Sequence, residues 1–209
     1  MIKKIIKENL VYLIAIILFI VLASNVNSIG LYKYILEIDN FIIEKINLII
    51  DSNLTAMFKF ITLFGDWYFS VFIILITLIF IKEKKYSIIL GINYILSFIL
   101  SFLTKIIISR PRPLNSIIPY PDQYSFPSGH TLTSIAFYIM LYYLISKTIN
   151  NKIFKNSLLI LIVMLLILIA FSRIYLGVHY FSDVIGGIIL GILFISMNIN
   201  ILKKQCKKI

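Results

Sequence analysis

Long apolar segments alternate with short polar ones along most of the chain. Six segments approach the roughly twenty apolar residues that an α-helix needs to cross about 30 Å of hydrocarbon. They cover residues 10–26, 67–81, 86–108, 131–145, 157–171 and 180–202. Some of these cores are short, so we expect their ends to extend into flanking polar residues. The pattern predicts an all-α integral membrane protein, with six transmembrane helices in one domain covering residues 1–209.

The segment between the first two predicted spans, residues 30–66, has a different pattern. Apolar pairs alternate there with charged residues at helical spacing, namely Glu37, Asp39, Glu44, Lys45 and Asp51. Such alternation is typical of an amphipathic helix that lies along the membrane interface rather than across it. In the last predicted span, Gly187 and Gly191 form a small-x3-small face, which predicts close packing against another helix.

The basic residues indicate how these spans are oriented. The net charge is +11, and thirteen of the 20 lysines and arginines fall on one side of the predicted membrane. Positive residues favour the cytoplasmic side, so both termini are predicted there, which requires an even number of spans. We therefore expect a multi-pass plasma-membrane protein and no nucleic-acid partner. The cytoplasmic groups are Lys3, Lys4 and Lys7; Lys82, Lys84 and Lys85; Lys147, Lys152 and Lys155; and Lys203, Lys204, Lys207 and Lys208.

Hydrophobic residues make up 60% of the 209 positions, which leaves no room for a sizeable soluble domain. Cys206 is the single cysteine and lies in the lysine-rich tail, so the chain cannot form an internal disulfide. Outside the two histidines and their neighbours, no cluster of His, Cys and carboxylates has metal-ligand spacing. We expect neither a metal site nor a cofactor.

The two histidines of the chain, His130 and His179, each begin a predicted span on the non-cytoplasmic side. Ionisable groups at such depths are costly and favour a functional interpretation. His130 follows Pro127, Ser128 and Gly129, which together predict a helix start whose N–H groups can bind an anion. This motif alone is equally compatible with an ordinary capped helix.

His179 and Asp183 are four residues apart, so they share one face of a helix. The carboxylate can then accept a proton from one ring nitrogen and leave the other nitrogen as a nucleophile. Arg173 precedes this pair. Lys105 lies near the end of the third predicted span, and Arg112 lies beyond the Pro111 that ends it. Lysine and arginine are the usual partners of phosphate oxygens, although either one alone is also a common interfacial anchor.

All of these groups fall on the same predicted side of the membrane, and together they indicate phosphoryl transfer through a phosphohistidine. We expect His179 to attack phosphorus while Asp183 orients it. His130 then protonates the leaving oxygen and later activates water. The phosphate-binding set is predicted to comprise Lys105, Arg112, Arg173 and the backbone amides of Ser128 and Gly129.

Three motifs make the chain similar to the type 2 phosphatidic acid phosphatase superfamily: Lys105-x6-Arg112-Pro113, Pro127-Ser128-Gly129-His130, and Ser172-Arg173-x5-His179-x3-Asp183. The resemblance implies the same roles for these residues. It also implies metal-independent hydrolysis, sensitivity to vanadate, and an all-helical core that opens toward the outer leaflet. Arg110 is a further cation to which the motifs assign no role.

The substrate stays open at this stage. The membrane lipids themselves are expected partners, and the resemblance favours a lipid phosphate or diphosphate, with undecaprenyl diphosphate first. Phosphatidylglycerophosphate and phosphatidate are the alternatives. A vanadium haloperoxidase shares the motifs, but the family's peroxidases are soluble. A non-catalytic lipid-phosphate binder or transporter would need cations but no oriented nucleophile. Oligomeric state cannot be predicted.

Overall fold

The computed structural model describes residues 2–27, 31–114, 116–119 and 124–205, with side chains from residue 10 to residue 204. Within these ranges all regular secondary structure is helical, apart from an isolated β-bridge between Pro111 and Tyr124. The helices are α1 (Ile2–Asn25), α2 (Tyr32–Asn47), α3 (Ser52–Thr62), η1 (Leu63–Gly65), α4 (Trp67–Phe80), α5 (Lys84–Ile108), α6 (Gly129–Thr148), α7 (Lys152–Tyr175) and α8 (Phe181–Gln205). The predicted all-α class is confirmed.

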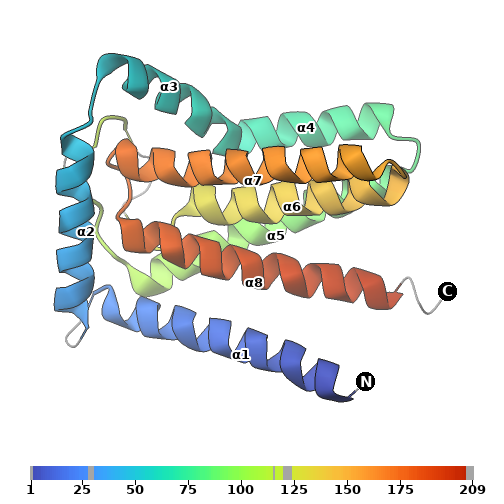
Figure 1. The fold of residues 1–209 in the computed structure, drawn as a ribbon, viewed down its shortest axis with the longest axis horizontal. Helices are drawn as coiled ribbons and strands as arrows, with labels where there is room; N and C mark the ends of the chain where they lie inside the picture. The colour runs from blue at the N-terminus through green and yellow to red at the C-terminus, as the bar shows by residue number, and fades with distance from the viewer. Residues whose placement is uncertain (1, 28–30, 115, 120–123, 206–209) are drawn as a thin grey trace.

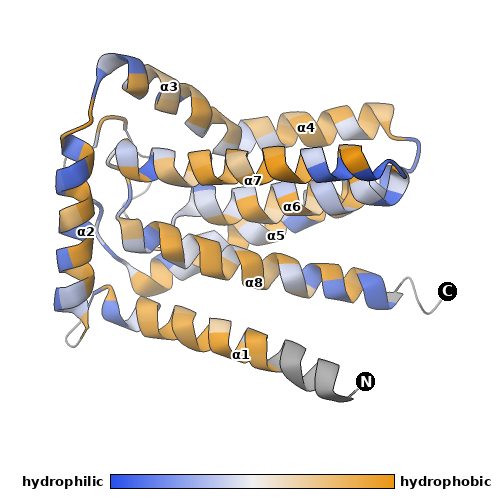
Figure 2. Ribbon diagram, viewed as in Figure 1, coloured by the Kyte–Doolittle hydropathy of each residue, from blue (hydrophilic) through white to orange (hydrophobic). Residues whose placement is uncertain are grey.

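The bundle is formed by helices that run alongside one another, namely α1, α4, α5, α6, α7 and α8, and α2 lies across one of its ends (Figure 1). The N-terminal end of α1 and the C-terminal end of α8 both lie at the opposite end. Apolar residues dominate the lengths of the helices, and polar residues gather at their ends and on α2 (Figure 2). The outer faces of α1, α5 and α7 expose many large apolar side chains. Exposed apolar surface of this extent is typical of a protein embedded in lipid.

Helix α6 forms the centre of the bundle and contacts α5, α7 and α8. Its close approach to α8 requires glycine at two positions one turn apart. A Cβ atom at Gly187 would lie 2.8 Å from the carbonyl oxygen of Ser128, and one at Gly191 would lie 3.2 Å from that of Leu132. The predicted packing role of this small-residue face is therefore confirmed.

The number of membrane spans is only partly supported. Three helices, α5, α7 and α8, are long and apolar enough to cross a membrane. A fourth span is possible if α3, η1 and α4 act as one broken helix with a bend of 51°. In the described residues, α1 contributes the shorter apolar stretch Leu10–Asn25. Helix α6 is not among these spans; most of its residues are buried or partly buried against other helices, so few of its side chains face outward. The six-span count therefore stays a prediction.

The predicted amphipathic segment, residues 30–66, forms two helices rather than one, and Gly30 lies outside the described residues. Helix α2 lies across the bundle end, and its buried positions include Asp39. Helix α3 instead packs against α7 and leads through η1 into α4. The helix breaks at Asp66, whose backbone is extended (φ −77°, ψ 154°). This break matters because it lies beside a predicted catalytic residue.

Candidate active site

The three motifs meet at the α2 end of the bundle. Lys105 lies on the last turn of α5 and Arg173 on the last turn of α7. His130 lies on the first turn of α6 and Asp183 on the first turn of α8, with His179 in the turn that precedes α8. The Ser128 N–H donates to the carbonyl oxygen of Asp183 (2.9 Å), which joins the second motif to the third.

His179 is enclosed, with 2% of its surface exposed. Arg112 Nη1 lies 3.3 Å from His179 Nε2. Because a guanidinium can only donate, Nε2 must accept, and the ring proton then lies on Nδ1. Nδ1 faces Asp183 Oδ2 at 3.5 Å, which is longer than a normal hydrogen bond. The structure therefore places the lone pair of the predicted nucleophile among the cations and its proton toward the carboxylate.

The electrostatic surroundings of His179 favour the neutral imidazole. Burial lowers the pKa of His179 well below its ordinary value, and the positive charges of Lys105, Arg112 and Arg173 lower it further. Both effects penalise a second proton on the ring. The unprotonated ring nitrogen required for nucleophilic attack is thus available across the neutral pH range.

Asp183 is fully buried and held by two donors. The Tyr180 N–H donates to Oδ2 (2.8 Å), and Arg110 Nη1 donates to Oδ1 (2.6 Å). Arg110, which the motifs left without a role, therefore contacts the carboxylate that faces the nucleophile. Burial alone would lower the pKa of Arg110, but Asp183 and Asp39 together raise it above its ordinary value, so the guanidinium stays charged.

The predicted phosphate-binding residues surround this pair and are largely buried. Lys105 Nζ donates to the carbonyl oxygen of Tyr124 (2.6 Å), and Arg173 Nη1 donates to Thr62 Oγ1 (2.6 Å). Arg112 Nη1 donates to the carbonyl oxygen of Val178 (2.6 Å). Ser128 and Gly129 stand at the N-terminus of α6, where backbone amides and the helix dipole favour an anion.

His130 has a partner that the motifs do not contain. Its Nε2 lies 2.9 Å from Asp66 Oδ1, and both side chains are 23% exposed. Asp66 also accepts from the Tyr68 hydroxyl through Oδ2 (2.8 Å). Asp66 lies 64 residues before His130, at the break between η1 and α4. The sequence signal available was a charged residue directly before an apolar run, which by itself indicates only a helix start.

The break that carries Asp66 is fastened to α6 along one face. His130, Ser134 and Tyr138 follow one another by a helical turn, and the Tyr138 hydroxyl donates to the carbonyl oxygen of Phe64 (2.7 Å). A Cβ atom at Gly65 would lie 3.0 Å from the His130 ring and 3.2 Å from Ser134 Oγ. Only glycine permits this approach without a shift of the neighbours, so the break holds Asp66 against His130.

His130 lies just before the predicted span that starts at residue 131, and its protonation responds to charges of both signs. Burial lowers the pKa of His130, Arg173 and Lys105 lower it further, and Asp66 opposes them, which leaves the pKa at about 4. The ring is therefore neutral at pH 7 when the site is empty. A bound phosphate would offset the neighbouring cations and raise the pKa of His130 toward the range that a general acid needs.

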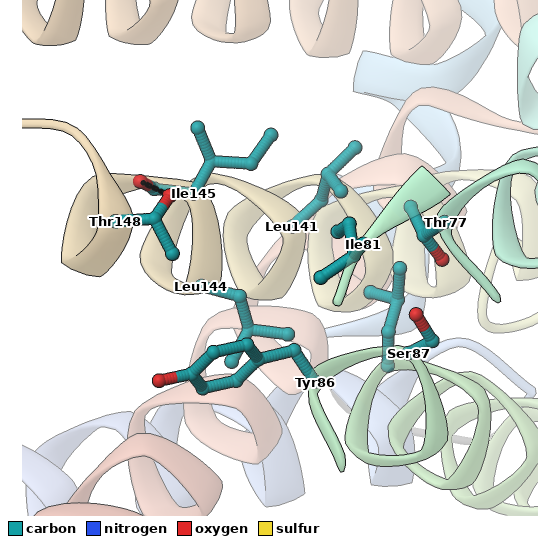
Figure 3. Close-up of a pocket in the computed structure, with 9 residues that line it drawn as sticks. Thr77, Ile81, Tyr86, Ser87, Leu141, Leu144, Ile145 and Thr148 are labelled. Atoms are coloured by element: carbon teal, nitrogen blue, oxygen red, sulfur yellow. Dashed lines mark hydrogen bonds between the residues drawn. The ribbon is translucent and has the colours of Figure 1, made fainter. Parts of the chain in front are cut away.

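A cavity of about 230 Å³ reaches His179 from the side of α2. It is bounded by Asn40 and Asn47 of α2, by Pro113 and Ile117 of the loop after α5, and by Tyr180. A separate apolar cavity of about 180 Å³ lies at the other end of the bundle, between α4, α5 and α6 (Figure 3). Leu141, Leu144 and Ile145 line it, and it contains none of the motif residues.

In the part of the chain that the structure describes, no three His, Cys, Asp or Glu residues are arranged to hold a metal ion. The charges that face the predicted nucleophile come from lysine and arginine instead. These cations suit the oxygens of a phosphate group.

The protein is an all-helical membrane protein in which two histidines, two aspartates and several buried cations gather at one end of the bundle. The family model of the PAP2 superfamily matches residues 85–205, and the chain belongs to this superfamily. It is therefore a phosphatase, and the resemblance read from the three motifs is confirmed.

Two curated relatives and one solved structure illustrate the similarity. An undecaprenyl-diphosphatase of Sulfolobus acidocaldarius is 29% identical over 199 residues, 90% of each chain. Phosphatidylglycerophosphatase B of Bacillus subtilis is 34% identical over 87 residues, 41% of this chain and 43% of that one. The crystal structure of a transmembrane PAP2 type phosphatidylglycerolphosphate phosphatase from Bacillus subtilis shares the fold. Its TM-score is 0.78 at 24% identity, over 92% of this chain and 96% of that one.

Proposed function

We propose that the protein hydrolyses a lipid phosphate or diphosphate through a phosphohistidine on His179, without a metal ion. The observation that carries this proposal is the orientation of the His179 ring, with Nε2 accepting from Arg112 and Nδ1 facing Asp183. A residue that only bound phosphate would have no need of a buried, neutral and oriented imidazole.

In the first step, Nε2 of His179 attacks phosphorus, the N–P bond forms and the bond from phosphorus to the leaving oxygen breaks. The leaving oxygen is the ester oxygen of a lipid phosphate or the bridging oxygen of a lipid diphosphate. The ring keeps its proton on Nδ1 and becomes cationic, and Asp183 balances that charge. Hydrogen bonds in empty active sites are often long, so we expect the distance of 3.5 Å between Nδ1 and Asp183 Oδ2 to shorten when substrate binds. Lys105, Arg112 and Arg173 stabilise the phosphoryl oxygens during the transfer.

His130 handles the protons of both steps. Asp66 accepts from Nε2, which leaves Nδ1 to take up a proton when the phosphate raises the pKa of the ring. That proton passes to the leaving lipid oxygen. In the second step His130 removes a proton from water, the water oxygen bonds to phosphorus, the N–P bond breaks and phosphate departs. His179 returns to its neutral form.

We propose that the six bundle helices all cross the plasma membrane, with both termini in the cytoplasm and the active site at the outer face. The distribution of lysines supports this topology. The arrangement of the helices also supports it, because the motifs gather at one end and the two chain ends at the other (Figure 1). Helix α2 would then lie along the outer interface, above the active site.

Undecaprenyl diphosphate is the substrate that we propose first, with phosphatidylglycerophosphate and phosphatidate as alternatives. Support for the first comes from the undecaprenyl-diphosphatase of Sulfolobus acidocaldarius, whose similarity extends over 90% of this chain. The similarity to phosphatidylglycerophosphatase B covers less than half of the chain, although its identity is higher. The motif residues hold the phosphate group and do not discriminate between the lipids.

The proposal is tested by phosphate release from the three lipids with purified wild-type and His179→Ala protein, in detergent with EDTA. We expect EDTA-resistant release by the wild type and loss of release in the variant, with undecaprenyl diphosphate as the fastest substrate. Unchanged release by His179→Ala would remove His179 as the nucleophile. Release from none of the lipids would favour a lipid-phosphate binder or transporter instead.

A further inference from the structure

Arg110 and Asp39 form a buried ion pair between α2 and the active site. Arg110 Nη2 donates to Asp39 Oδ2 (2.8 Å), while Nη1 of the same guanidinium donates to Asp183 Oδ1 (2.6 Å). The guanidinium also stacks on Tyr180, with Cζ 4.1 Å from the ring centroid. Arg110 is 2% exposed and bridges two carboxylates, so it does not belong with the cations that face the phosphate.

Asp39 is the unexpected member of this group. It lies on the amphipathic helix α2, yet none of its surface is exposed. Besides the bond from Arg110, it accepts from the Ser182 N–H (2.9 Å) and from the Ser182 hydroxyl (2.5 Å). A buried carboxylate is costly unless every oxygen is paired, and here the partners belong to the first turn of α8 and to the loop after α5. Asp39 therefore ties α2 to the two segments that carry the catalytic motifs.

The charges of this group determine how much negative charge reaches His179. Two carboxylates surround one guanidinium, so the group carries one net negative charge. If Asp39 were absent, the positive charge of Arg110 would cancel the negative charge of Asp183. The His179 imidazole would then face its neighbouring cations without an opposing negative charge. The ring becomes cationic when it is phosphorylated, and that state needs the negative charge of Asp183 most.

We propose that Asp39 is a positioning residue that balances the positive charge of Arg110, so that Arg110 does not cancel the negative charge of Asp183 and Asp183 keeps its place beside His179 during phosphoryl transfer. The proposal rests on the proposed function and deepens it. It gives α2 a role in catalysis as well as in covering the site. It also explains why a helix at the membrane interface contains a fully buried aspartate.

The test compares Asp39→Asn with Ser182→Ala in full-length protein purified in detergent. Ser182→Ala removes the hydroxyl that donates to Asp39 and accepts from Arg110 Nη1 (2.7 Å) without changing the charge of the group, which makes it the matched control. We expect kcat of Asp39→Asn to fall about 10- to 100-fold, which is the range seen when a residue that orients a metal-ligating side chain is lost. We expect its KM to stay nearly constant and Ser182→Ala to retain most of its kcat.

Inhibition constants distinguish positioning from a general loss of structure. Vanadate bonded to the histidine resembles the transferring phosphoryl group, whereas inorganic phosphate needs only the cations. In Asp39→Asn we expect vanadate to bind more weakly in proportion to the loss of kcat, with phosphate binding nearly unchanged. Equal weakening of both inhibitors together with a lower Tm would show a structural role only and would overturn the proposal.

Arg110→Lys provides a second variant if Asp39→Asn does not fold. Lysine keeps the positive charge but loses the fork that reaches both carboxylates, so kcat and vanadate affinity should again fall together. Full activity in either folded variant would overturn the proposal and leave the proposed function intact. A wild type that neither releases phosphate nor binds vanadate would instead overturn the proposed function itself.

Discussion

The site contains two histidine–aspartate pairs that differ in how they are built. His179 and Asp183 are four residues apart in sequence and enclosed, with 2% and 0% of their side chains exposed. His130 lies on α6 and Asp66 at the break between η1 and α4, and both side chains are 23% exposed. The enclosed pair suits a nucleophile, which must be held in one orientation and kept neutral. The more open pair suits proton exchange, because a leaving lipid and an incoming water must both reach it.

The largest expected effect comes from removing the imidazole of the open pair. His130→Ala should lower kcat with a lipid phosphate by about 10²- to 10⁴-fold, because the leaving alkoxide is no longer protonated. p-Nitrophenyl phosphate has a leaving group that needs no proton, so the variant should still show a burst of nitrophenol before turnover stalls. Stopped-flow absorbance measures this burst. Its absence in His130→Ala would contradict the separate roles of the two histidines.

Asp66→Asn should have the next largest effect. We expect kcat with a lipid phosphate to fall about 10- to 100-fold, because the amide no longer supports a proton on His130. The loss should be much smaller with p-nitrophenyl phosphate. Steady-state kinetics with the two substrates measures the difference. Asp183→Asn is the matched control, because it should slow turnover of both substrates alike. If Asp66→Asn also slowed both substrates alike, Asp66 would act with the nucleophile instead.

Gly65→Ala sharpens the comparison by moving the open pair without changing its chemistry. The added Cβ would lie 3.0 Å from both the His130 ring and Ile169, so the break that carries Asp66 must shift by a few tenths of an ångström. We expect kcat to fall about tenfold, since catalysis is sensitive to small misplacements. Gly91→Ala is the control, because its Cβ meets only Ile74 at an ordinary 3.8 Å. Equal kcat values in the two variants would contradict the proposed role of the break.

The smallest expected effect concerns the pH profile of the enclosed pair. The acid limb of kcat/KM should lie below pH 6.5, because burial and the cations lower the pKa of His179. Lys105→Met removes one of these cations, which makes a proton on His179 less costly and raises its pKa. The acid limb should then move upward by about one pH unit. A limb that stayed in place or moved downward would show that another group controls it.

The sequence predicted the enclosed pair because local spacing decides it. The two residues are only four apart, and the segment predicted for residues 180–202 became α8, which spans Phe181–Gln205. The structure differs in one respect, because His179 lies in the turn before α8 rather than on the helix face predicted for it. The third and fourth predicted spans likewise fall within α5 and α6. In these cases apolar length and helix-start signals carry the information.

The sequence could not predict the partners that come from distant segments. Asp66 meets His130 only because the chain breaks between η1 and α4, and Asp39 meets Arg110 across 71 residues. Amphipathic spacing placed Asp39 on the polar face of an interfacial helix, where a charge is normally solvated. Its burial follows from how α2 packs on α8 and on the loop after α5, which no local pattern encodes.

The central claim is that His179 carries the phosphoryl group, and rapid acid- or base-quench of the enzyme with a ³²P-labelled lipid phosphate tests it most directly. We predict a labelled phosphohistidine that survives alkali, is lost in acid and maps to residue 179. It should be absent from His179→Ala, and it should accumulate in His130→Ala when ³²P-labelled p-nitrophenyl phosphate is the substrate, because that leaving group needs no proton and only the hydrolysis step is slowed. Label on another residue, or turnover by His179→Ala without any phosphoenzyme, would contradict the account.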